Sequence, residues 1–388
     1  MSSRFVAENI KNLPFSGIRK FFDIASEMED VISLGVGEPD FSTPWNIREE
    51  AIFSLERRRT MYSSNAGMPE LRAEISRYMS EKYDLTYSPS NQILVTVGAS
   101  EGIDVALRAI IEPGDEVLVV EPCFVSYKPC VKMAGGVPVP VPTSAENNFR
   151  LSPDDISSKL TSKTKAILIS YPNNPTGAVM ELSNLKSIAS VLRDKDILVI
   201  SDEIYSELTY SENRHVSIAS LPGFEDKTVV LNGFSKAFAM TGWRLGYACG
   251  PADIINAMTK IHQYIVMCAP TTAQYGGIEA LRNGDESVAQ MREEYNYRRR
   301  FMLSAFNEIG IECFEAKGAF YLFPSIKQFG VSSDEFCMTL LNEQKLAVVP
   351  GSAFGDCGDG FIRCSYAYSI DSIKEALFRL EAFISSIK

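Results

Sequence analysis

The chain has 388 residues, 38 Lys and Arg against 49 Asp and Glu, and a formal net charge of −11. An acidic chain with 45% apolar residues is typical of a soluble globular protein, and its charge argues against binding nucleic acid or an anionic membrane. Only two histidines occur, His215 and His262, which nearly excludes zinc sites built on histidine and catalytic triads with a histidine base. We therefore expect no metal site.

The pattern of cysteines and apolar runs favours a reducing compartment inside the cell. Eight cysteines are scattered without a CxxC pair, which is typical of buried thiols in a reducing compartment. No apolar run reaches 18 residues, so no transmembrane helix is expected, and the N-terminal segment lacks the apolar region of a signal peptide. We expect a cytoplasmic protein.

The first two thirds of the chain alternate short apolar runs with amphipathic stretches. This pattern predicts an α/β fold with a mostly parallel sheet that is covered on both faces. In chain order we predict a helix at Met68–Lys82, a strand at Gln92–Val97, a helix at Ser100–Ile111, strands at Glu116–Val120, Val137–Val141 and Ala166–Ser170, a helix at Leu182–Lys195, strands at Ile197–Ser201, Thr228–Leu231 and Leu245–Cys249, and a helix at Pro251–Met267.

From about Asn283 the pattern changes to that of a second, α+β unit. In chain order we predict a long charged helix at Val288–Ile309, strands at Ile311–Phe314 and Ala319–Phe323, a helix at Ser333–Gln344, strands at Ala347–Val349 and Phe361–Ser365, and a helix at Asp371–Ile387. We predict a large domain of residues 46–285 and a smaller domain made of residues 1–45 together with 286–388.

Polar and aromatic residues follow the predicted strands, where an open α/β sheet binds its ligands. After the first strand, residues 98–102 open a helix whose free N–H groups and Ser100 hydroxyl suit a phosphate. The same residues also fit a simple helix cap after a tight turn. After the second strand, Phe124 could stack on a planar ring or pack in the core.

Three later strands end in residues that carry chemistry. A rigid turn presents Asn174, and an apolar strand ends in Asp202, an acid that is costly to bury unless it is paired. Lys236 follows the next strand, with Arg244 eight residues further on. Together these strand ends match a flat, phosphorylated, nitrogen-containing ring that is bound covalently to an amine. Pyridoxal phosphate has those requirements.

Seven motifs resemble those of one enzyme family. Residues 233–246, GFSKAFAMTGWRLG, resemble the lysine signature of the class I and II aminotransferases. Six further segments resemble the family's motifs in the same order: SLGVGEPDF, YSSNAGMPELR, YPNNPTGAV, SDEIYSELTY, VVPGSAFG and GFIRCSYA. The resemblance covers nearly the whole chain and implies the type I fold of aspartate aminotransferase, with seven mostly parallel strands between helices. Within the family, the chain resembles the aromatic-amino-acid and N-acetyl-diaminopimelate aminotransferases.

The resemblance implies roles for the residues around the cofactor ring. Lys236 is expected to form the imine with the cofactor aldehyde and to move the substrate proton. Asp202 is expected to pair with the pyridine nitrogen and keep it protonated. Asn174 and Tyr205 would hydrogen-bond the phenolic oxygen, while Phe124 would stack on the ring.

The resemblance also implies a phosphate site that two subunits share. Many relatives carry Ser or Thr where this chain has Gly233, so one hydroxyl is either missing or supplied differently. Tyr62 would reach the phosphate from the neighbouring subunit, which predicts a homodimer. The other expected phosphate ligands are the backbone N–H groups of Ala99 and Ser100, the hydroxyls of Ser100 and Ser235, and Arg244.

Substrate recognition is expected to depend on Arg363, whose fork would bind the α-carboxylate beside Gly37 and Asn174. A dicarboxylate-specific relative places an arginine in the loop that corresponds to Ile261–Gly277, and this stretch has none. The aromatic and sulfur-containing residues of the stretch could line a pocket or pack at an interface, and an N-terminal cation could still bind a second carboxylate. These candidates are Tyr264, Met267 and Tyr275 for the pocket, and Arg19 or Lys20 for the cation.

The leading hypothesis is an aminotransferase that moves an amino group from an amino acid to a 2-oxo acid, such as 2-oxoglutarate, by a ping-pong mechanism. Aromatic donors are favoured, with aspartate or an N-acyl-diaminopimelate next. The alternative is a β-lyase on the same scaffold. A non-catalytic regulator of this fold would carry an additional DNA-binding domain before the large domain. Only about 45 residues precede the large domain here and the chain is acidic, which argues against this alternative. A nicotinamide dehydrogenase would need G-x-G-x-x-G after the first strand, which GASEG does not match.

Overall fold

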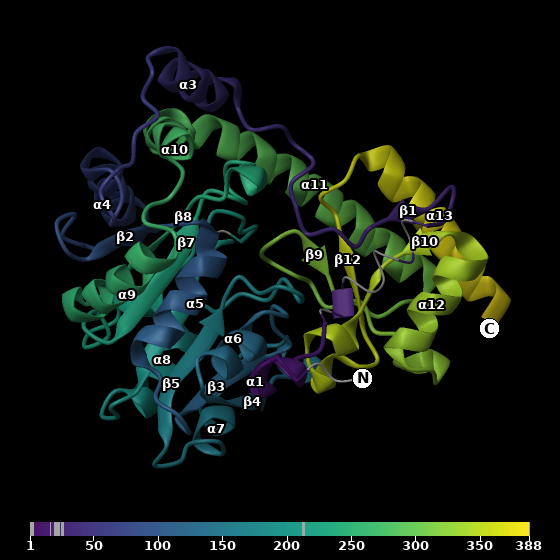
Figure 1. Ribbon diagram of the computed structural model, residues 1–388. Coiled ribbons are helices and arrows are strands. Elements are labelled where there is room, and N and C mark those ends of the chain that lie inside the picture. The colour runs from purple at the N-terminus through teal and green to yellow at the C-terminus, as the bar shows by residue number, and fades with distance from the viewer. Residues whose placement is uncertain (1–3, 16, 19–23, 25–26, 212–213, 388) are drawn as a thin grey trace.

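A computed structural model describes residues 4–15, 17–18, 24, 27–211 and 214–387. Its centre is a seven-stranded sheet with the order β2-β8-β7-β6-β5-β3-β4 (Figure 1). β8 is antiparallel to both of its neighbours, and the other pairs are parallel. The predicted fold class is therefore confirmed. The strands are β2 (Ile93–Thr96), β3 (Glu116–Glu121), β4 (Val137–Pro142), β5 (Thr164–Ser170), β6 (Leu198–Asp202), β7 (Thr228–Gly233) and β8 (Gly246–Cys249).

The composition of each strand matches its place in the sheet. All residues of β2, β7 and β8 are buried, as expected for apolar strands covered on both faces. β4 has the alternating sequence VPVPVP and lies at the edge of the sheet. Proline has no N–H to donate, so an edge strand, which needs to pair on one side only, tolerates it.

Helices cover both faces of this sheet and bring the first turn of α5 to its carboxyl edge (Figure 1). The apolar side of α5, which includes Ile103, Ala106 and Leu107, is buried in the core cluster that the central strands share. The helices of this part are α3 (Trp45–Glu56), α4 (Pro69–Tyr83), α5 (Gly98–Ile110), α6 (Tyr127–Met133), α7 (Pro153–Ser157), α8 (Leu182–Leu192), α9 (Ala252–Ile265) and α10 (Thr271–Asn283). The short helix α1 (Glu8–Lys11) contacts α6.

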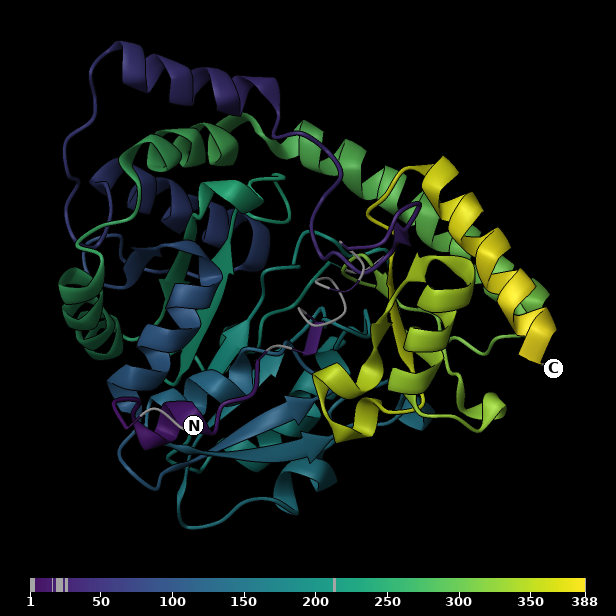
Figure 2. The same ribbon diagram turned by 45° about the vertical axis from the view of Figure 1, so that its right-hand side comes forward.

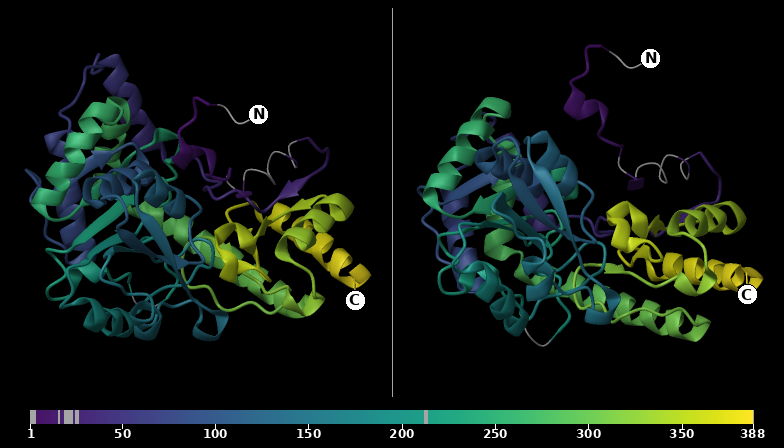
Figure 3. Two further views of the ribbon diagram at one scale, coloured as in Figure 1. Left: turned by 60° about the horizontal axis from the view of Figure 1, so that its bottom comes forward. Right: turned by 90° about the horizontal axis from the view of Figure 1, so that it is seen from below.

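The C-terminal part of the chain packs with a segment from near the N-terminus, because β1 pairs with β10. The long helix α11 (Asp285–Ile309) leads from α10 to this part (Figure 2), and α12 (Ser333–Gln344) and α13 (Ile370–Ile387) gather beside it (Figure 3). A three-stranded sheet has the order β11-β12-β9, and β1 pairs with β10 in a parallel ladder. The division at residues 45 and 285 stays a prediction. The strands are β1 (Ile32–Ser33), β9 (Tyr321–Leu322), β10 (Leu346–Ala347), β11 (Val349–Pro350) and β12 (Ile362–Ser365).

Several predicted elements differ from the structure. The predicted strand at Ile311–Phe314 is wrong: the segment forms no ladder, and Phe314 instead packs against the ring of Phe149 at 5.3 Å between centroids. The predicted strand at Ala347–Val349 is divided, because Ala347 pairs with Ser33 in one sheet and Val349 pairs with Arg363 in another. Among the α-helices of the described residues, five were not predicted: α1, α3, α6, α7 and α10. Within the described part of the chain, no helix is both long and apolar enough to cross a membrane.

Candidate active site

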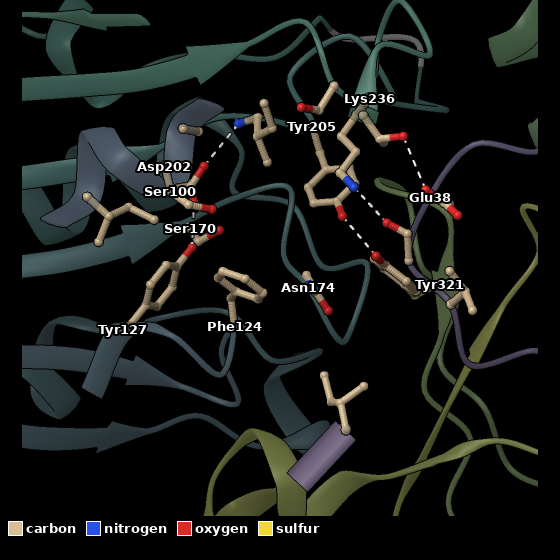
Figure 4. Close-up of a pocket in the computed structure, with 18 of the residues that line it drawn as sticks. Glu38, Ser100, Phe124, Tyr127, Ser170, Asn174, Asp202, Tyr205, Lys236 and Tyr321 are labelled. Atoms are coloured by element: carbon tan, nitrogen blue, oxygen red, sulfur yellow. Dashed lines mark hydrogen bonds between the residues drawn. The ribbon is translucent and has the colours of Figure 1, made fainter. Parts of the chain in front are cut away.

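A cavity of about 360 Å³ lies at the carboxyl ends of β5, β6 and β7 (Figure 4). The large sheet contributes the loops that follow its strands and the first turn of α5. The N-terminal segment 35–38, β9 and β12 close the other side. Of the predicted site residues, the cavity brings together Gly37, Ala99, Ser100, Phe124, Asn174, Asp202, Tyr205, Ser235, Lys236, Arg244 and Arg363.

Lys236 follows β7 and points into this cavity. Its Nζ donates a hydrogen bond to the backbone oxygen of Gly37 at 2.6 Å. The pKa of the amine is lowered from 10.5 to about 8, chiefly by burial; the guanidinium groups of Arg363 and Arg244 contribute to the fall, and the charges of Glu38 and Asp202 oppose it. About a tenth of the amine is therefore unprotonated and nucleophilic at pH 7, far more than for a solvated lysine.

Asp202 is the last residue of β6 and is 5% exposed. Its carboxylate accepts hydrogen bonds from the Tyr127 hydroxyl at 2.7 Å and from the Ile204 N–H at 3.2 Å. Burial raises the pKa of this carboxyl, and the two hydrogen bonds oppose the rise. An anion held in a low-dielectric cavity favours a cationic partner, which the nitrogen of a protonated pyridine ring would supply.

Aromatic side chains form the walls of the cavity (Figure 4). The hydroxyls of Tyr205 and Tyr321 lie 2.8 Å apart, in a buried hydrogen bond between β9 and the turn after β6. Phe124 contacts Tyr127 edge to face at 5.7 Å between centroids. Tyr127 thus places a hydroxyl beside Asp202, and Phe124 adds a ring face to the same wall of the cavity.

The first turn of α5 forms the cationic end of the cavity. Gly98 adopts a φ of +74°, and a Cβ at this position would lie 2.4 Å from Nη2 of Arg244. Arg244 itself adopts a φ of +53° and donates from Nη1 to the backbone oxygen of Thr241 at 2.9 Å. Backbone N–H groups at a helix start, a guanidinium and the nearby hydroxyls of Ser100 and Ser235 are a donor set suited to a phosphate.

Gly233 faces backbone rather than the cavity. A Cβ there would lie 2.9 Å from Cα of Gly246 and 3.0 Å from the backbone oxygen of Leu245. The close approach of β7 and β8 therefore leaves no room for a side chain, which accounts for glycine at this position. Thr241 lines the cavity, but its hydroxyl donates to Glu38 at 3.1 Å.

Arg363 lies on β12 and is 2% exposed. Its Nη1 donates to Oδ1 of Asn174 at 2.8 Å, and its Nη2 donates to the backbone oxygen of Gly35. The guanidinium also lies over the ring of Tyr321, 4.4 Å from the centroid. Nε is buried with no hydrogen-bond partner among the described residues, so this cation retains a donor for a ligand.

The remaining predicted residues lie elsewhere. Tyr62 is 79% exposed and lines a separate surface hollow with Tyr275, whose ring lies 5.0 Å from the guanidinium of Arg59. Tyr264 is exposed as well, and neither it nor Met267 lines the cavity of this chain. The stretch Ile261–Gly277 is not a loop as expected, because the end of α9 and the start of α10 occupy most of it. Arg19 and Lys20 lie outside the described residues.

The cavity residues that the sequence did not single out include Glu38, Tyr127 and Tyr321. Glu38 stands inside the quoted motif GEPDF, where its charge was the available signal. The two tyrosines reach Asp202 and Tyr205 only through the folding of α6 and β9, and no local pattern marks them.

Comparisons with known proteins agree with this geometry. The family described as aminotransferase class I and II matches residues 29–380. The YugH protein of Bacillus subtilis is 53% identical over 380 residues, with 98% of each chain covered. An aspartate aminotransferase of Pyrococcus abyssi is 46% identical, with 96% of each chain covered. The crystal structure of an aromatic aminotransferase from Pyrococcus horikoshii superposes with a TM-score of 0.91 at 43% identity, covering 94% of this chain and 99% of that one.

The fold and the matches define the class of protein: the chain belongs to the class I and II aminotransferases. It is a transaminase, and the family resemblance predicted from the seven motifs is confirmed.

Proposed function

We propose that this aminotransferase binds pyridoxal phosphate through Lys236 and exchanges amino groups between an amino acid and a 2-oxo acid by a ping-pong mechanism. One observation carries the proposal: a buried lysine with a pKa of about 8 shares a cavity with the carboxylate of Asp202 and the guanidinium of Arg363. These groups meet the needs of an aldehyde, a ring nitrogen and a substrate carboxylate, respectively.

The residues fit the cofactor at both of its ends. The first turn of α5 and Arg244 offer donors to the phosphate, with a glycine where a side chain would strike the guanidinium. At the other end of the ring, Asp202 supplies the anion for the ring nitrogen. Pyridoxal phosphate, when bound, supplies an aldehyde that combines with amines and a protonated ring that withdraws electrons from the substrate Cα.

The chain's own residues would handle the substrate and its proton. Arg363 binds the α-carboxylate with its fork, and its unpartnered Nε shows that the guanidinium has capacity beyond its contacts in the protein. Nζ of Lys236 takes the proton from the amino acid Cα and later returns a proton to the Cα of the 2-oxo acid. Tyr205 and Asn174, which border the same cavity, position the ring oxygen.

Aromatic amino acids are the donors that the cavity favours. Apolar side chains of Ile18, Val36 and Ile103 line it. Among its described lining residues, the only lysine and arginines are Lys236, Arg244 and Arg363, each with a role already. A second carboxylate would thus meet no dedicated cation among these described residues, whereas an aromatic side chain would gain contact with apolar groups. Aspartate and N-acyl-diaminopimelate rank behind for this reason.

We further propose a cytoplasmic homodimer in which Tyr62 reaches the partner's phosphate site. Tyr62 is exposed and is not among the residues that line the cavity of its own chain, and both observations support this assignment. All eight cysteines are free, as expected in a reducing compartment.

A substrate panel tests the reaction. The enzyme with pyridoxal phosphate is mixed with 2-oxoglutarate and tyrosine, phenylalanine, aspartate, alanine, methionine or N-acetyl-diaminopimelate, and glutamate is measured. We expect one glutamate to form for each donor molecule that is consumed, and the aromatic donors to give the highest kcat/KM. Release of ammonia without any 2-oxo acid would instead indicate the β-lyase.

Borohydride reduction tests the attachment residue. Reduction of the loaded enzyme should fix the cofactor to the peptide that contains Lys236 and abolish activity. The variant Lys236→Ala serves as the control, since it should acquire no reduced cofactor. Full turnover by this variant would refute the assignment.

A further inference from the structure

We propose that His262 and Glu101 form a positioning pair for the cofactor phosphate. In this pair the imidazole holds the carboxylate, and the carboxylate holds the turn from β2 into α5. The inference rests on the proposed function, because it takes the first turn of α5 as the phosphate site.

Glu101 connects the phosphate turn to a neighbouring helix. It follows Ser100 directly in the first turn of α5. One oxygen, Oε2, accepts a hydrogen bond from the backbone N–H of Val97, the residue that precedes the helix. The other, Oε1, lies 2.7 Å from Nδ1 of His262. A single carboxylate thus closes the strand-to-helix turn and ties it to α9, which packs along α5 (Figure 1).

Among the described residues, the side chain of His262 has one hydrogen-bond partner, Glu101. The side chain is fully buried in the last turn of α9. A carboxylate has no hydrogen to donate, so Nδ1 carries the hydrogen and donates it. Nε2 is buried with no hydrogen-bond partner among the described residues. An unpaired buried nitrogen costs free energy that an apolar side chain at this position would not, so the contact with Glu101 is what the imidazole provides.

The opposite side of the same turn is held by backbone. A Cβ on Gly246 of β8 would lie 2.5 Å from the backbone nitrogen of Ala99, so the strand and the turn are in direct contact. The guanidinium of Arg244 lies against Gly98 in the same region. The turn whose backbone N–H groups are proposed to bind the phosphate is therefore fixed between β8 on one side and the Glu101–His262 pair on the other. Loss of the pair should let these N–H groups move.

The test compares pyridoxal phosphate with pyridoxal, which lacks the phosphate. Apoenzyme is titrated with each compound by calorimetry, for the unaltered protein and for His262→Leu, which fills the space but cannot donate. We expect His262→Leu to bind pyridoxal phosphate about 10-fold more weakly and pyridoxal with an affinity changed by less than about twofold. Thermal unfolding of the apoenzyme should shift to lower temperature, because the largely buried carboxylate of Glu101 loses its donor, and the affinity for pyridoxal shows whether the rest of the site stays folded.

Two further variants separate positioning from folding. His262→Asn places an amide N–H close to the position of Nδ1 and should restore most of the affinity. Asn256→Leu, an exposed position on the same helix, serves as a control and should bind both compounds normally. An equal loss of affinity for both compounds in His262→Leu, or no loss, would overturn the inference. If the unaltered apoenzyme bound neither compound, the proposed function itself would fail.

Discussion

The chemistry of Lys236 depends on where the fold buries it. An amine attacks an aldehyde only when it is unprotonated, and the pKa of this amine is lowered to about 8, chiefly by burial. The rate at which the apoenzyme captures pyridoxal phosphate should therefore rise with pH and level off above about pH 8. Stopped-flow absorbance between pH 6 and 10 measures this profile.

The residue Glu38 offers a control for this profile. Its charge raises the pKa of Lys236, so Glu38→Gln should move the midpoint to lower pH. A midpoint near 10 in the unaltered enzyme, as for a solvated lysine, would contradict the lowered pKa.

A second prediction at this scale concerns the fork of Arg363. Lysine keeps the charge but not the planar pair of donors. The variant Arg363→Lys should lower kcat/KM for amino acids by about 10- to 100-fold, the cost of one or two charge-assisted hydrogen bonds, and leave the affinity for pyridoxal phosphate unchanged. Steady-state kinetics and a cofactor titration check the two parts. Unaltered kcat/KM would remove Arg363 from the substrate site.

Several residues of the cavity could be predicted because each follows or ends a strand whose apolar run is visible in the sequence, whereas others, such as Arg363, came from the family resemblance. Lys236 and Asp202 are examples, and both line the cavity at the carboxyl edge of the sheet. Tyr127 and Tyr321 could not be predicted, since their partners are distant in the chain and only packing brings them together. The same holds for His262, whose carboxylate partner lies 161 positions away.

At the scale of elements, the sequence predicted the strands that are buried on both faces. It did not predict a helix whose glycines pack closely against neighbouring residues. The central strands were found because continuous apolar runs indicate coverage on both faces. The helix α10 was not predicted, and it contains the adjacent glycines Gly276 and Gly277, which have low helix propensity. In the structure these glycines allow contact: a Cβ at Gly276 would lie 2.7 Å from the Trp243 ring, and one at Gly277 would lie 2.6 Å from Leu245.

Close contact between β8 and α5 leads to a prediction at Gly246. The substitution Gly246→Ala would place a methyl group 2.5 Å from the backbone nitrogen of Ala99, and neither backbone can yield cheaply. We expect a loss of about 1–3 kcal/mol in the free energy of unfolding and weaker binding of pyridoxal phosphate. Denaturant unfolding and cofactor titration measure the two effects.

Gly242 provides the matched control for this substitution, because a Cβ there meets nothing within 4 Å. Gly242→Ala should therefore change neither quantity. If the two variants had the same free energy of unfolding and the same affinity for pyridoxal phosphate, α5 would not depend on its contact with β8.

At the scale of the whole molecule, the apolar residues at the surface are unevenly placed. Met61, Tyr62 and Tyr264 are each more than three quarters exposed; the first two stand in the connection between α3 and α4, and Tyr264 stands in the last turn of α9. Large exposed side chains of this kind are typical of a surface that another chain covers. A second copy would bury them and bring Tyr62 towards the partner's phosphate site, as the proposed dimer requires.

Mixed dimers test whether the active site is shared. Lys236→Ala and Tyr62→Ala chains should each be weakly active alone at limiting pyridoxal phosphate. In a hybrid, one site carries both defects, whereas the other combines an intact Lys236 with the partner's intact tyrosine. Random exchange makes half of the dimers hybrid, so activity should rise to about a quarter of that of the unaltered enzyme. Activity is assayed before and after subunit exchange. If exchange restored no activity, Tyr62 would serve its own chain or no phosphate at all.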